Sequence, residues 1–214
     1  FKVLDSSKIN HILKNKLMKK NIIKFIEVSE LPSEIANFKV HAFTEKQSKK
    51  DHLAITLGDI KSMGSVLTRI HSQCITGESF FSLRCDCRYQ LSESLNQIAK
   101  KGCGVIFYLQ QEGRGIGLSN KIRAYKLQDS GFDTVEANHQ LGFHEDERNY
   151  EIVSAMADYL KIKSIDLMTN NPKKIDAMEK SGLKINKRIP IKSKSNDHNK
   201  NYLDTKAKKL GHLM

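Results

Sequence analysis

Three closely spaced cysteines are the residues best suited to metal chemistry in this sequence, in the pattern Cys74-x10-Cys85-x-Cys87. If Cys85 and Cys87 lie on extended chain, their spacing sends both thiols to one side, and Cys74 completes the set from a preceding loop. Three thiolates leave one tetrahedral position of Zn²⁺ vacant, where a bound water becomes a nucleophile at neutral pH. Two alternatives stay open: ordinary buried thiols, or a closed structural site with His71 as fourth ligand.

Two further segments are suited to binding an anion. The segment 110–118 is rich in glycine and contains Arg114, so it combines close backbone approach with a bidentate cation. It matches neither the P-loop nor the dinucleotide-binding spacing, and a flexible turn is the alternative. At 169–174, Asn171 as N-cap and Pro172 at the first helical position predict a helix start, whose free N–H groups attract anions.

The surrounding pattern predicts a mixed α/β fold, a single compact domain with a mixed sheet. Apolar and polar residues alternate over 38–42 and 53–57, as in half-buried strands, the apolar run at 104–109 predicts a buried strand, and 66–70 and 165–168 are further strand candidates. Apolar residues at helical spacing predict helices over 91–102, 117–131 and 147–160, and one from Pro172 to Gly182.

Composition excludes several classes of protein. The 214 residues suffice for one buried core, and the longest uncharged apolar run is far shorter than the ~20 residues that cross a bilayer. The net charge is +12, but the excess lies at the two ends and the centre is balanced, which is weak support for nucleic-acid binding. No signal-peptide pattern precedes the cysteines, so we expect a cytoplasmic protein with reduced or metal-bound thiols.

Seven blocks, in order between residues 69 and 174, resemble the motifs of GTP cyclohydrolase II. They are RIHSQC at 69–74, SLRCDC at 82–87, QEGRGIGL at 111–118, NKIRAY at 120–125, DTVEAN at 133–138, DER at 146–148 and LMTNNPKK at 167–174. The resemblance implies a zinc-dependent hydrolase that opens the imidazole ring of GTP at C8 and releases formate and pyrophosphate. The product is 2,5-diamino-6-ribosylamino-4(3H)-pyrimidinone 5′-phosphate, and the reaction is the first step of riboflavin biosynthesis.

The resemblance also implies site residues. One Zn²⁺ per subunit is expected on Cys74, Cys85 and Cys87, and Mg²⁺ with the substrate phosphates. Catalytic roles fall to Tyr125 at the ring-opening centre, Asp146 as proton acceptor and Arg148 facing the α-phosphate. Residues expected to bind GTP are Arg69, Ile70, His71, Ser72, Gln73, Gln90, Glu112, Gly113, Arg114, Thr134, Thr169 and Lys174.

The domain organisation expected from the resemblance has three parts. Residues 1–30 form a basic extension, 31–190 the GTP cyclohydrolase II catalytic domain, and 191–214 a basic C-terminal tail. A homodimer without membrane or nucleic-acid partners is expected. The competing hypotheses are a cyclohydrolase-derived domain of a bifunctional riboflavin enzyme, and a basic structural-zinc protein that binds nucleic acid.

Overall fold

A seven-stranded mixed sheet forms the centre of the computed structural model, which describes residues 22–193 and 195–213. Its strands, in spatial order, are β1 (Ile23–Pro32), β2 (Asn37–Glu45), β3 (Asp51–Leu57), β5 (Gly104–Leu109), β4 (Val66–Ser72), β6 (Ser164–Met168) and β7 (Lys184–Ile189). The first four of these pair antiparallel, whereas β5, β4, β6 and β7 pair parallel. The predicted mixed α/β class is confirmed.

The parallel strands carry the polar loops of the molecule at one edge of the sheet. Because β4, β5 and β6 run in the same direction, the segments that follow them leave from the same edge. These segments contain Cys74, the glycine-rich stretch and Asn171 respectively. In open α/β sheets, ligands bind outside the carboxyl ends of parallel strands, so this topology brings the predicted chemistry together.

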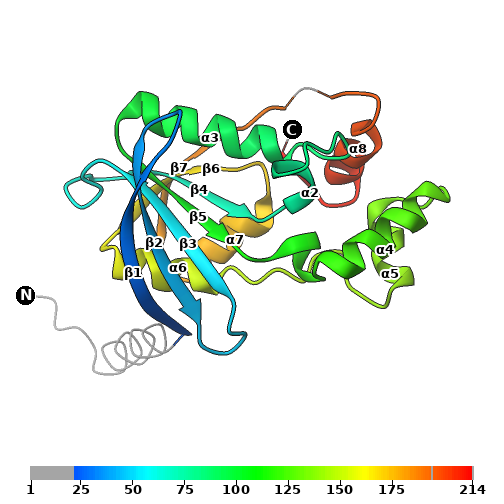
Figure 1. The fold of residues 1–214 in the computed structure, drawn as a ribbon, viewed down its shortest axis with the longest axis horizontal. Helices are drawn as coiled ribbons and strands as arrows, with labels where there is room; N and C mark the ends of the chain where they lie inside the picture. The colour runs from blue at the N-terminus through cyan, green and yellow to red at the C-terminus, as the bar shows by residue number, and fades with distance from the viewer. Residues whose placement is uncertain (1–21, 194, 214) are drawn as a thin grey trace, which may run out of the picture.

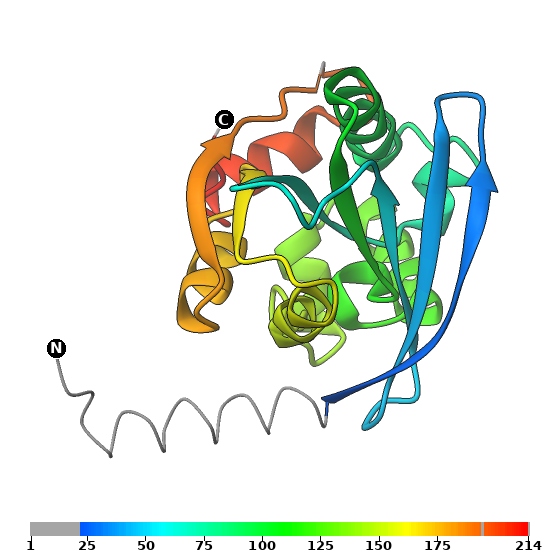
Figure 2. The ribbon, with the colours of Figure 1, turned by 90° about the vertical axis from the view of Figure 1, so that its left-hand side faces the viewer.

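Helices cover both faces of the sheet (Figures 1 and 2). On one face α3 (Cys87–Lys101) packs through Ile98 against Ile106 of β5. On the other, α6 (Glu151–Tyr159) and α7 (Pro172–Lys180) pack against Val105 and Phe107. Strand β5 is therefore apolar on both sides, as expected for a strand buried between two helical layers.

The other helices gather beyond the carboxyl edge of the strands (Figure 1). They are α2 (Ile75–Glu78), the 3₁₀ turn η1 (Glu112–Gly115), α4 (Leu118–Asp129), α5 (Thr134–Gln140) and α8 (Lys200–Lys208). The predicted end of one helix and start of another are confirmed. Helix α3 ends at Gly102, whose φ of 72° is left-handed, and the Asn171 side chain caps α7 by accepting from the Lys173 N–H.

Three local expectations differ from the structure. Residues 23–30, assigned to the extension, form most of β1, an edge strand whose largely exposed side chains give little alternation. Helix α8 lies within the predicted tail. Cys87 begins α3 rather than continuing an extended chain. Residues 1–21 of the predicted extension lie outside the described residues, and the three-part domain division stays a prediction.

No helix in the described part of the chain combines the length and apolarity that a bilayer crossing requires.

Substitution of Gly104 tests how closely β5 approaches β4 and α3. A Cβ at this position would lie 2.7 Å from the Leu67 carbonyl oxygen and 2.8 Å from Ile98 Cγ1. We expect Gly104→Ala to lower the free energy of unfolding by about 1–3 kcal/mol, measured by urea denaturation, because the buried backbone has to shift. Gly64→Ala is the control, since a Cβ there meets nothing within 4 Å. Equal stability of the two variants would contradict this packing.

Candidate active site

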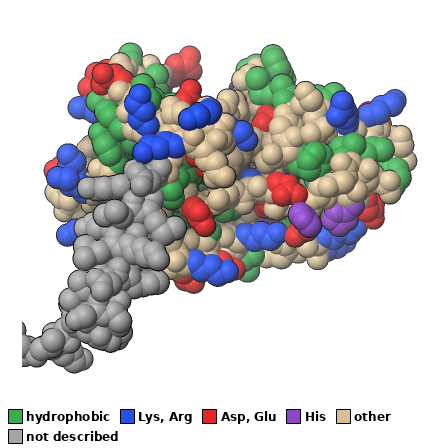
Figure 3. Space-filling model, turned by 90° about the horizontal axis from the view of Figure 1, so that it is seen from below, with side chains coloured by type: hydrophobic (Ala, Val, Ile, Leu, Met, Phe, Trp, Pro, Cys, Tyr) green, Lys and Arg blue, Asp and Glu red, His purple; other side chains and the backbone are tan. Residues whose placement is uncertain are grey.

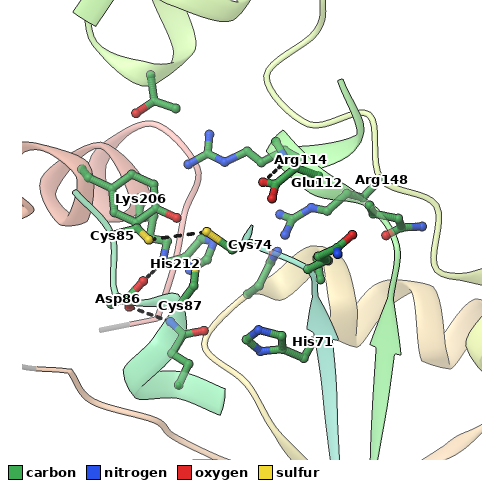
Figure 4. Close-up of a pocket in the computed structure, with 18 of the residues that line it drawn as sticks. His71, Cys74, Cys85, Asp86, Cys87, Glu112, Arg114, Arg148, Lys206 and His212 are labelled. Atoms are coloured by element: carbon green, nitrogen blue, oxygen red, sulfur yellow. Dashed lines mark hydrogen bonds and ion pairs between the residues drawn. The ribbon is translucent and has the colours of Figure 1, made fainter. Parts of the chain in front are cut away.

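A cavity of about 320 Å³ lies at the carboxyl edge of the parallel strands. Its lining comes from the segments after β4, β5 and β6, from α3, α4 and α5, and from α8 (Figure 4). Segments more than a hundred residues apart in sequence thus share one site.

The three predicted metal ligands converge in this cavity. The sulfur atoms of Cys74, Cys85 and Cys87 all lie within 4.8 Å of one another, with 3.6 Å between the Sγ atoms of Cys74 and Cys85. Tetrahedral Zn–S bonds of about 2.3 Å place sulfur ligands about 3.8 Å apart, so the donor set fits zinc. Within the described residues, His71 is not part of this cluster.

Gly77 makes room for the thiols. A Cβ on Gly77 would lie 2.7 Å from Cys85 Sγ and 3.2 Å from Cys74 Sγ. Helix α2 therefore approaches the sulfur cluster as closely as a bare backbone permits.

Lys121 compensates the charge of the cluster from α4. Its buried Nζ donates hydrogen bonds to Cys74 Sγ at 3.1 Å and to Glu112 Oε1 at 2.7 Å. Hydrogen bonds from Cys85 and Cys87 lower the pKa of the Cys74 thiol far below its usual range, and the charge of Lys121 lowers it further. The hydrogen bond and the charge of Lys121 favour the thiolate form of Cys74, which is the form that binds a metal.

Glu112 lines the cavity and also connects three structural elements through hydrogen bonds. Its Oε1 accepts from Lys121 and from the Gly113 N–H at 2.8 Å, and its Oε2 accepts from the Ile75 N–H at 2.6 Å. The carboxylate thus joins η1, α4 and α2. One acceptor position on Oε2 is left for a substrate N–H group.

The glycine-rich segment is a strained turn rather than a flexible one. Gly113 and Arg114 both have left-handed backbones, with φ of 63° and 59°. A Cβ on Gly115 would lie 2.9 Å from the backbone of Glu147, so only glycine fits there. Both Nη atoms of Arg114 are buried and have no partner among the described residues. This guanidinium is held in place with its donors unused.

Arg69 and Lys174 are buried cations that bind neutral oxygens. Arg69 Nη1 donates to the Met168 carbonyl at 2.8 Å, and Lys174 Nζ donates to the Ile70 carbonyl at 2.7 Å. Burial lowers the pKa of Arg69 to about 10 and that of Lys174 well below its ordinary value. Neither has a carboxylate partner among the described residues, so an anion entering the cavity would stabilise the charged form of both.

Asp146 and Arg148 form a bidentate pair at the cavity wall. Arg148 Nε donates to Asp146 Oδ1 at 2.7 Å and Nη2 donates to Oδ2 at 2.6 Å. Burial alone would raise the pKa of Asp146, but the hydrogen bonds and charge of Arg148 lower it overall. Burial would lower the pKa of Arg148, but Tyr150 and Asp146 raise it. Both groups stay ionised at neutral pH.

Tyr125 and His71 lie beside the cysteines. The Tyr125 hydroxyl is 3.1 Å from Thr76 Oγ1, and burial raises its pKa, so it keeps its proton. His71 Nε2 is hydrogen-bonded to Glu78 Oε1 at 2.8 Å, while its Nδ1 is buried and unpartnered among the described residues. Burial lowers the pKa of His71, which is therefore neutral.

Comparison with known proteins decides the family. The family described as GTP cyclohydrolase II matches residues 24–190. The chain belongs to the GTP cyclohydrolase II family.

Relatives of this GTP cyclohydrolase II chain share about half of its residues. The GTP cyclohydrolase-2 of Saccharophagus degradans is 53% identical over 191 residues, which cover 89% of this chain and 96% of that protein. That of Hahella chejuensis is 53% identical over 192 residues, covering 90% and 93%. A riboflavin biosynthesis protein of Vibrio vulnificus is 48% identical over 193 residues, covering 90% of this chain and 53% of its own length.

The structure brings nearly all predicted site residues of this GTP cyclohydrolase II family member to one cavity. Those that line it are Cys74, Cys85, Cys87, Arg69, His71, Ser72, Gln73, Gln90, Glu112, Gly113, Arg114, Tyr125, Thr134, Arg148, Thr169 and Lys174. Asp146 stands behind Arg148. The side chain of Ile70 lies in the hydrophobic core, and this residue reaches the site through the carbonyl that binds Lys174.

Sequence reasoning missed several residues of the site. Lys121 lies within the NKIRAY block and Glu78 is the last residue of α2, but neither was assigned to the site, and only their contacts to Cys74 and His71 reveal them. Tyr202, Lys206 and His212 lie in the segment interpreted as a tail. Burial and the charge of Lys206 lower the pKa of His212 to about 3, so this side chain is neutral.

The Asp146–Arg148 pair predicts an acid-sensitive contribution to stability. Because the folded-state pKa of Asp146 is lowered, its contribution is complete above about pH 4 and is lost as pH falls through the folded pKa. We expect Asp146→Asn to cost about 3 kcal/mol at pH 7 and much less at pH 3, measured by urea unfolding. Exposed Asp176→Asn is the control; an Asp146→Asn deficit that is the same at both pH values would refute the pairing.

Proposed function

We propose that the chain hydrolyses GTP at C8 of the imidazole ring with release of formate and pyrophosphate. The product would be 2,5-diamino-6-ribosylamino-4(3H)-pyrimidinone 5′-phosphate, which places the reaction first in riboflavin biosynthesis. One observation carries the proposal: a three-thiol cluster without a fourth ligand among the described residues lines the same cavity as three cations without carboxylate partners.

The thiol cluster supports a catalytic zinc. Cys74, Cys85 and Cys87 would hold Zn²⁺, which when bound supplies an activated water for attack on an electrophilic carbon. Lys121 donates a hydrogen bond to Cys74 Sγ, and the Tyr125 hydroxyl, which retains its proton, would donate it at the ring-opening centre. Glu112 would accept from the guanine N–H groups through its remaining acceptor position.

The three unpaired cations support a triphosphate site. Arg69, Arg114 and Lys174 line the cavity without carboxylate partners among the described residues, so an anionic ligand would stabilise the charged form of each. A triphosphate carries more negative charge than these groups offset, so Mg²⁺ bridging its oxygens is part of the proposal. Thr134 and Thr169, which line the same cavity, would add neutral hydrogen bonds.

Arg148 is better suited to stabilising charge than to attacking phosphorus. A protonated guanidinium has no free lone pair, and Asp146 binds two of its nitrogens. We therefore assign Arg148 to the developing charge at the α-phosphate and Asp146 to its orientation. The proton-acceptor role implied for Asp146 by the resemblance would require Arg148 to be released first.

The alternative hypotheses predict other features. A nucleic-acid protein needs a continuous basic face, whereas basic and acidic side chains are interspersed on the face seen in Figure 3. Fusion to a second riboflavin enzyme is compatible with the Vibrio vulnificus relative, of which this chain covers 53%. A homodimer and a cytoplasmic location complete the proposal.

Incubation with GTP tests the proposed reaction. Zinc-loaded protein with GTP and Mg²⁺ should yield formate and pyrophosphate in equal amounts, because one ring opening and one phosphate cleavage occur per substrate. The absorbance of the new pyrimidine should rise in step with both. Unchanged GTP would sink the proposal.

Cys85→Ser tests the role of the metal, with Cys103→Ser as its matched control. It replaces one ligand with a poor one, so we expect loss of bound zinc and of formate, whereas Cys103→Ser, outside the cluster, should keep both. Normal formate yield from metal-free Cys85→Ser protein would remove zinc from the mechanism.

The two assignments for Arg148 are separated by substitution. If Arg148 stabilises charge, Arg148→Lys should keep pyrophosphate release within about a hundredfold of the unmodified enzyme, since one cation remains, and Arg148→Met should lose far more. Release of pyrophosphate is followed with a coupled assay. Equal and complete loss in both variants would favour a required arginine nucleophile.

A further inference from the structure

Helix α8 forms a wall of the cavity although the family match ends at residue 190. Tyr202 and Lys206 of this helix line the site, and so does His212 after it. The Tyr202 ring lies 5.6 Å from the Arg114 guanidinium and 4.5 Å from Lys206 Nζ. The end of the segment is tied down, because the Leu213 N–H donates to the Asn170 carbonyl at 2.8 Å.

Lys206 makes a buried ion pair with Asp86, which lies between two cysteine ligands (Figure 4). Lys206 Nζ is 2.6 Å from Asp86 Oδ1, and the two residues are only 7% and 6% exposed. Gln90 Nε2 donates to Asp86 Oδ2 at 2.6 Å, and Ser193 Oγ donates to the same oxygen at 3.0 Å. Both oxygens of the carboxylate thus have hydrogen-bond partners.

This position of the Asp86 side chain is not required by the helix that follows it. Asp86 is the N-cap residue of α3, yet its carboxylate makes no capping hydrogen bond. Such a cap is the ordinary use of aspartate at this position. The carboxylate instead faces α8, and Gln90, which binds it, also accepts from Arg69 Nη2. One chain of contacts joins α8, the cysteine turn and a buried cation of the cavity.

We propose that Lys206 is a positioning residue of the metal centre. Through Asp86 it fixes the turn that carries Cys85 and Cys87, and through Gln90 it fixes the orientation of Arg69. It also offsets the charge of Asp86, which would otherwise lie buried and unpaired beside the three sulfur atoms. The inference deepens the proposed function and rests on its zinc site, and it makes α8 a necessary part of the centre.

Zinc affinity of the full chain, measured by competition with a chelator, tests this role. We expect Lys206→Met to weaken zinc binding about 10–100-fold, as loss of a group that orients metal ligands does. It should also shift the thiolate absorption bands of the cobalt-substituted protein. Lys206→Arg, which keeps the charge, should recover most of both. Lys208→Met is the matched control, because Lys208 is an exposed lysine of the same helix.

The double variant Asp86→Asn/Lys206→Met separates positioning from simple destabilisation. It leaves no unpaired charge, so it should fold with near-normal thermal stability and still show weak zinc binding and the altered cobalt spectrum. Unmodified zinc affinity and spectrum in Lys206→Met or in the double variant would overturn the inference. An unmodified chain that takes up no zinc would instead contradict the proposed function, so the two failures are distinguishable.

Discussion

Charge buried at the carboxyl ends of β4, β5 and β6 is the constraint on which the site depends. Three carboxylates are each matched to one cation, as Glu112 with Lys121, Asp146 with Arg148, and Asp86 with Lys206. A buried charge without a partner is strongly destabilising, so each of these pairs must form when the chain folds. Arg69, Arg114 and Lys174 have no carboxylate partner among the described residues, so an anion that binds in the cavity would pair with them.

Two of these pairs join segments that the sheet does not hold together. Glu112 and Lys121 join the turn after β5 to α4, and Asp86 and Lys206 join the start of α3 to α8, 120 residues later. Cys74 and Cys85 lie outside regular structure between β4 and α3, and Cys87 is the first residue of α3, so no strand pairing holds the three together. Side-chain ion pairs supply there the order that hydrogen-bonded strands supply in the core.

The sequence was informative wherever the determinant was local. Gly102 and Asn171 mark helix ends through their own backbone and side-chain chemistry, and the cysteine spacing pointed to a metal. It was uninformative where partners are remote: Lys206 acquires its meaning only from Asp86, and exposed β1 is a strand only because β2 pairs with it. The cysteines converge by a turn into α3, a geometry that two-residue spacing alone does not reveal.

Unsatisfied hydrogen-bonding groups show where the structure is incomplete without a ligand. Buried polar atoms in folded proteins nearly always have partners. Among the described residues, the exceptions include Arg69 Nε, His71 Nδ1 and Ser72 Oγ, and all three residues line the one cavity. The guanidinium of Arg114, a residue with a left-handed backbone, adds two Nη groups without partners in the same cavity. Backbone strain and unused hydrogen-bond donors are thus concentrated in a cavity whose carboxylates are already paired. A preorganised anion-binding site has these features, because the substrate supplies the missing acceptors.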